Sequence, residues 1–109
     1  MKLPKGDRAI VPLEKLIGYC LNLDHPKGKH KAKVFKSVLG ITTENVEQLY
    51  ELVQQAAVEG EVVQQTATSF GKEFKLDWAI PETENVQLRT LWIIESESDV
   101  PRLISAFIK

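Results

Sequence analysis

Cysteine is almost absent from this chain, which has 109 residues and a single cysteine, Cys20. One cysteine excludes an intramolecular disulfide and fits a reducing compartment, so we expect a cytoplasmic protein. We predict that Cys20 is a small buried apolar residue. Long apolar runs are absent as well, and the first residues lack the apolar stretch of a signal peptide. We therefore expect no membrane association.

Several chemistries are excluded by what the sequence lacks. One cysteine and two histidines are too few for a structural zinc site. No glycine-rich phosphate loop and no GxSxG motif is present. We expect neither a metal nor a cofactor. The net charge is −1, so the molecule as a whole has no general attraction to nucleic acid.

The composition is that of an ordinary globular domain. Hydrophobic residues make up 43% of the chain and charged residues 27%, which is far from the profile of a disordered protein. If the chain were divided into two domains, each would be too small to bury a stable core. We therefore predict one domain over residues 1–109.

Helical periodicity dominates the first sixty residues. It predicts helices over about 12–21, over 29–39, and from Thr42 or Thr43, as the N-cap, to Gly60. Pro12 suits a first helical turn, and Gly40 suits a helix end.

The period changes to two after Gly60, as expected for half-buried strands. We predict strands over 61–66, 74–80, 86–94 and 103–108, joined by connections too short for parallel crossovers. The fold class is thus α+β, with three N-terminal helices packed on a C-terminal four-stranded antiparallel sheet. The predicted core residues are Leu16, Phe35, Leu49, Val53, Phe74, Leu76 and Trp78.

Charge is distributed unevenly. Residues 25–43 hold five lysines, two histidines and no acid, whereas residues 37–71 hold five glutamates and neither lysine nor arginine. A helix that begins among lysines attracts anions, because its free N–H groups add to their charge. His25 and His30 add groups that can carry protons near neutral pH.

On the predicted helix, Lys29, Lys33 and Lys36 share one flank, where they form either an ordinary solvated face or a phosphate-binding one. His30 lies beside this flank and is a candidate proton carrier. His25 precedes a proline and fits a turn better than a catalytic role.

Lys31 falls on the apolar face of the same helix. Either it reaches into water by its long stem, or a cleft holds it for a phosphate. Because a buried ammonium needs compensation, we expect an acidic side chain or an anion near it, beside His30.

The third predicted strand carries further candidates. Arg89 and Thr90 must point to opposite faces of a regular strand, so they cannot share one pocket. Trp92 fits the core, although it could also stack on a base. Arg102 begins the last strand, either as a surface ion-pairing residue or as a phosphate contact.

Some of these residues together form a recognisable signature: Asn22-x-x-His25-Pro26-x-Gly28-x-His30-Lys31-Ala32-x-x-Phe35, Leu39-Gly40, Arg89-Thr90-x-Trp92-Ile93 and Pro101-Arg102-Leu103. Over nearly the whole chain the sequence resembles a bacterial domain-of-unknown-function family. That family occurs as small stand-alone proteins beside short partner genes, and at the ends of phage-head and polymorphic-toxin proteins. Such modules resemble metal-independent toxin ribonucleases.

The resemblance implies RNA cleavage without a metal, by attack of the 2′-hydroxyl on the adjacent phosphorus, and a small antitoxin-like partner. It implies His30, Lys31, Arg89 and Thr90 as catalytic residues. Substrate contacts would come from His25, Lys29, Lys33, Trp92 and Arg102. The alternative is a non-catalytic module that binds a protein partner or nucleic acid through its lysine-rich helix.

Overall fold

A computed structural model describes all residues, 1–109. Three helical regions precede the sheet, as the periodicity predicts. The first comprises α1 (Leu13–Lys15) and the π-helical η2 (Leu16–Cys20). The second comprises α2 (Lys29–Val34) and the π-helical η3 (Phe35–Leu39), and it ends at Gly40, whose φ of 67° favours glycine.

The third region is the long helix α3 (Val46–Glu59), preceded by the 3-10 turn η4 (Thr43–Asn45). Thr42 caps it: its hydroxyl accepts from the Glu44 amide at 3.2 Å, and its own amide donates to Asn45 Oδ1 at 2.7 Å. A further 3-10 turn, η1 (Gly6–Arg8), lies near the N-terminus.

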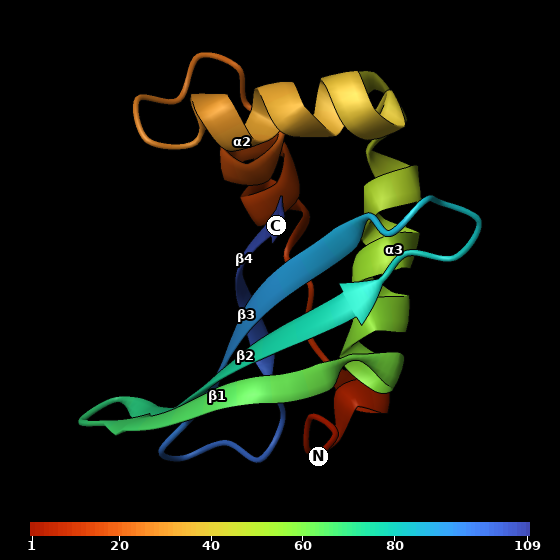
Figure 1. Cartoon of the computed structure of the whole chain (residues 1–109). Helices are drawn as coiled ribbons and strands as arrows, with labels where there is room; N and C mark the ends of the chain where they lie inside the picture. Colours follow the sequence, from red (N-terminus) through yellow and green to blue (C-terminus); the bar gives the residue numbers. More distant parts are fainter.

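Four antiparallel strands make one sheet in the order β1-β2-β3-β4. They are β1 (Glu61–Thr68), β2 (Gly71–Ala79), β3 (Gln87–Glu95) and β4 (Arg102–Ile108). The predicted α+β class and antiparallel sheet are therefore confirmed. Figure 1 shows α3 behind the sheet, α2 across one end of the molecule above η2, and no element in front of the sheet.

The core lies between the helices and one face of the sheet. Alternate residues of β2 and β3 point into it, which is why Leu76, Leu88 and Trp92 are fully buried. All seven predicted core residues are buried, each at most 7% exposed, and Cys20 is buried as predicted. Burial raises the pKa of the Cys20 thiol, against smaller opposite effects of the Ala106 amide and Lys31. None of the helices combines the length and the apolar content that crossing a bilayer requires.

Candidate functional site

The turn before α2 is built around His25. Its Nδ1 accepts the backbone amides of Lys27 and Gly28, both at 3.0 Å, and its ring lies edge-on to Tyr19 with centroids 4.8 Å apart. A Cβ at Gly28 would lie only 2.6 Å from the Tyr19 carbonyl oxygen, so glycine lets α2 start directly against η2. His25 therefore shapes the turn from which the lysines project, as its place before Pro26 indicates.

The outer side of α2 and η3 carries a continuous set of exposed basic side chains. We call this set the α2 basic face; its members are Lys27, Lys29, His30, Lys33 and Lys36. None of them has a carboxylate within 4.0 Å, and His30 makes no hydrogen bond through its side chain. Val34 and Val38, 36% and 47% exposed, follow His30 at a spacing of four residues and lie at one border of this face. This surface combines positive charge with apolar contact area.

Lys31 points the other way, towards the end of β4. Its Nζ lies 4.3 Å from the ring centroid of Phe107 and 5.8 Å from that of Tyr19. The expected acidic partner is absent, because no carboxylate lies within 4.0 Å of Lys31 in the ion pairs of the chain. Aromatic faces take that role, since a ring quadrupole attracts a cation. Tyr19 and Phe107 are far from Lys31 in sequence, so no local pattern could have indicated them.

Arg89 lies on the open face of the sheet and is fully engaged there. Its Nε and Nη2 donate to Asp77 at 2.7 and 2.9 Å, and Lys109 Nζ donates to the same carboxylate at 3.0 Å. The Arg89 guanidinium, and to a lesser degree Lys109, hold the pKa of Asp77 below its ordinary value, while partial burial opposes them. The same pairing raises the pKa of Arg89. The Arg89 guanidinium is therefore already bound to a carboxylate, which it shares with Lys109.

Thr90 and Trp92 lie on the opposite, helix-facing side of β3, and both are fully buried. Trp92 Nε1 donates to Thr90 Oγ1 at 2.8 Å, so the two side chains satisfy each other inside the core. The strand alternation that separates Arg89 from Thr90 is confirmed. Both side chains lie in the core of this structure, and the catalytic role expected of Thr90 and the substrate contact expected of Trp92 stay predictions.

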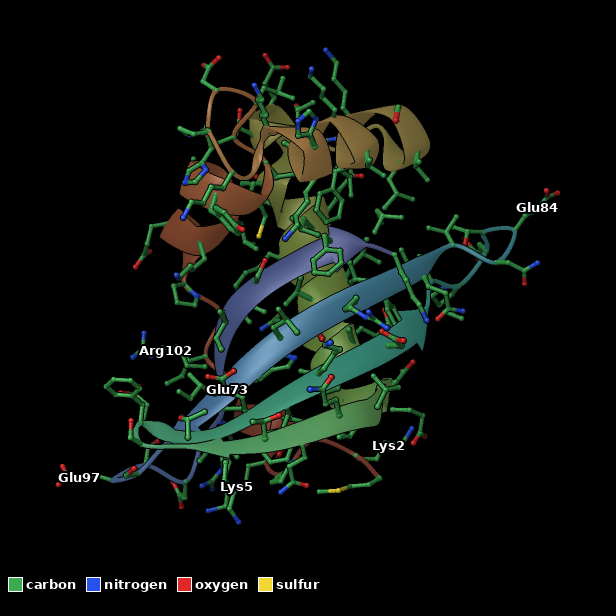
Figure 2. The ribbon with its side chains drawn as sticks, turned by 60° about the vertical axis from the view of Figure 1, so that its left-hand side comes forward. Lys2, Lys5, Glu73, Glu84, Glu97 and Arg102 are labelled. Carbon is green, nitrogen blue, oxygen red and sulfur yellow. The ribbon has the colours of Figure 1, made fainter.

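Arg102 lies at the far end of β4 and pairs with Glu95 at 3.6 Å. Phe107 is five positions further along the strand, roughly 17 Å away. Figure 2 shows Arg102 near the end of the sheet that carries Glu97, away from α2. Arg102 is therefore an ion-pairing surface residue remote from Lys31.

The structure thus gathers only part of the predicted set. Lys31 lies over Phe107, which stands opposite Arg89 in the register of β3 and β4, while Thr90, Trp92 and Arg102 lie elsewhere. None of the hollows in the surface lies at Lys31 and Phe107. The largest of these hollows, of about 560 Å³, is lined by Val11, Leu13, Glu47, Tyr50 and Glu51. No three histidine, cysteine or acidic side chains are grouped to hold a metal ion.

Comparison with known proteins identifies a family for the whole chain. A family model described as a domain of unknown function (DUF6883) matches residues 2–109. No curated protein and no solved structure matches the chain.

Proposed function

Because the chain belongs to the DUF6883 family, a domain of unknown function, we propose a function from its own surface. The protein binds single-stranded RNA, and the α2 basic face holds the phosphates. The observation that carries this proposal is the placement of its unpaired cations.

The chain has 14 lysines and arginines. Five of them form ion pairs with carboxylates: Lys2, Lys5, Arg89, Arg102 and Lys109. Every lysine from residue 27 to residue 36 lacks such a partner. Cations that repel one another on one helix destabilise it slightly, and a bound polyanion removes that repulsion. Their concentration on one face favours an extended anion over a single phosphate.

The apolar side chains of the same surface favour an unpaired strand over a duplex. Val34 and Val38 are exposed in line with His30, at one border of the α2 basic face. Single-stranded RNA offers the faces of its bases to such side chains, whereas a duplex stacks them inside. The two helical segments from Lys29 to Leu39 span roughly 16 Å, enough for a few nucleotides.

Cleavage of that RNA is the second candidate. It rests on exposed His30, which stands among the phosphate-binding lysines and could carry a proton. It has less support than binding, because Arg89 is ion-paired, Thr90 is buried and Lys31 lies against aromatic rings.

The test is binding of a fluorescent single-stranded RNA, measured by anisotropy at low salt. Replacing Lys29, Lys33 and Lys36 together by glutamine should weaken binding by about tenfold or more, because three phosphate contacts are lost. The matched control replaces three other unpaired cations, Arg8, Lys72 and Lys75, by glutamine. This control loses the same charge and should keep the affinity within about twofold.

Equal loss of affinity in both triple variants would mean that net charge, rather than the α2 basic face, governs binding. Absence of binding by the wild-type protein would overturn the proposal. Gel analysis of the same RNA tests cleavage: fragments made by wild-type protein but not by His30→Ala would establish the second candidate.

A further inference from the structure

Strand β1 is an exposed edge with almost no charge. The longest stretch of the chain without a charged residue runs from Val62 to Gly71 and covers most of this strand. Every residue from Val63 to Phe70 is exposed. An exposed segment of this length is ordinarily rich in charge, so its composition calls for a physical reason.

The two edge strands of the sheet, β4 and β1, differ in how far other segments cover them. The backbone of Ile10 bonds to Pro101 and Leu103 at the start of β4, and η2 packs against the rest of that strand. On β1, only the amide of Val62 has such a partner, the carbonyl oxygen of Met1 at 2.9 Å. Figure 1 shows β1 at the open edge of the sheet.

Pairing of β1 with β2 is regular from Gln64 to Thr68, after a shift at Val63. In an antiparallel ladder, alternate residues direct their N–H and C=O groups away from the neighbouring strand. Those groups of β1 form a row that another strand can bind. Monomeric proteins protect such an edge with lysine, proline or a covering segment, and residues 64–68 have none of these.

We propose that β1 is a dimerisation strand that pairs antiparallel with β1 of a second copy, joining two sheets into one of eight strands. A two-fold axis near Thr66 makes the interface self-complementary. Because residues 62–68 of the strand are uncharged, the symmetry places no like charges opposite one another.

The exposed apolar side chains at the ends of β1 favour a second copy over an unrelated strand. Phe70, at the hairpin tip, is 75% exposed, and Val63, near the other end, is 51% exposed. Antiparallel pairing about Thr66 brings Phe70 of each copy to the other end of the partner strand, near the exposed Val63. The pairing therefore covers Phe70, the most exposed aromatic residue of the chain, in both copies.

Sedimentation equilibrium tests the proposal. The wild-type protein should be a dimer, and Gln65→Lys should be a monomer, because the symmetry would set two introduced lysines close together. The matched control is Gln48→Lys, the same change at an exposed position of α3, and it should remain a dimer. Circular dichroism of both variants verifies that each is folded.

Cross-linking gives a second measurement. In a Cys20→Ala background, a cysteine replaces Gln65, Thr66 or Ala67 in turn, and mild oxidation should link two copies through at least one of them. A cysteine at Thr43 should not cross-link. A monomeric wild-type protein at the highest concentration it tolerates would overturn the proposal and leave the edge to a strand of another protein. A dimer that persists in Gln65→Lys would overturn it too.

Discussion

Lys31 is the residue whose environment differs most from that of its neighbours on α2. Its charge lies over aromatic rings instead of in water, whereas Lys33, two residues further along α2, is exposed. A cation over a ring contributes about 0.5–2 kcal/mol, and a methionine of similar length recovers much of the packing.

We therefore expect Lys31→Met to fold and to lose no more than about 1–2 kcal/mol of unfolding free energy. It should weaken RNA binding less than Lys33→Met, its matched control on the exposed side. Urea denaturation and RNA anisotropy measure the two effects. The opposite order of affinities would put the anion centre at Lys31, as the sequence pattern predicts.

Asp77 of β2 binds two cations on the open face of the sheet. Arg89 of β3 and Lys109, which follows β4, both donate to its carboxylate. Its lowered pKa means that the folded protein holds this carboxylate ionised more strongly than the unfolded chain does. The resulting stability is complete above the unfolded pKa, near 4, and is lost as the pH falls through the folded value.

Asp77→Asn should accordingly cost roughly 1.5–3 kcal/mol at neutral pH, the range for hydrogen bonds to charged groups. The difference from wild type should shrink as the pH is lowered below about 4. Urea denaturation at several pH values measures it. A cost that stays constant down to the most acidic pH would show that the ion pair is not its source.

At the scale of single elements, the turn η4, which leads into α3, depends on the capping box at its start. The Thr42 hydroxyl accepts from the Glu44 amide, and the Asn45 side chain accepts from the Thr42 amide. Thr42→Ala should lower the unfolding free energy by about 1 kcal/mol, because one amide at the helix start loses its acceptor. Thermal denaturation measures this.

The neighbouring Thr43→Ala is the control, since the Thr43 side chain is exposed and forms no hydrogen bond within the chain. It should change stability by less than about 0.5 kcal/mol. Equal effects of the two substitutions would mean that helix propensity, rather than the cap, controls this end of α3.

At the scale of the whole molecule, the proposed RNA binding depends on where charge lies more than on how much there is. With a net charge of −1, the protein cannot attract RNA as a body. If the proposed RNA binding is right, the four exposed lysines of the α2 basic face should give a slope of about −3 for log affinity against log salt on single-stranded RNA.

A slope near that value, reduced to about −1 in the variant without Lys29, Lys33 and Lys36, would agree with phosphate binding at this face. Anisotropy titrations at several salt concentrations measure it. A slope near zero would mean that the wild-type protein binds RNA without releasing counterions, contrary to the proposal.

The element types and most of the core follow from periodicity alone. Leu16, Leu49 and Leu76 are buried because apolar residues recur with the repeat of the helix or strand that carries them. The separation of Arg89 from Thr90 also follows from the sequence, since alternation along a strand is a local property.

The surroundings of the candidate residues required the tertiary structure. Phe107 reaches Lys31 only because β4 ends under α2, and Asp77 reaches Arg89 only through the register of β2 and β3. Sequence spacing carries no information about either contact, because both join residues from different elements.

The same holds for the two surfaces proposed to bind partners. The sequence by itself determined that lysines cluster after His25 and that residues 62–71 carry no charge. Only the tertiary structure decided that carboxylates stay away from those lysines and that β1 is the uncovered edge of the sheet. The physical reason is that ion pairing and edge coverage depend on packing between distant segments, whereas composition and periodicity are fixed along the chain.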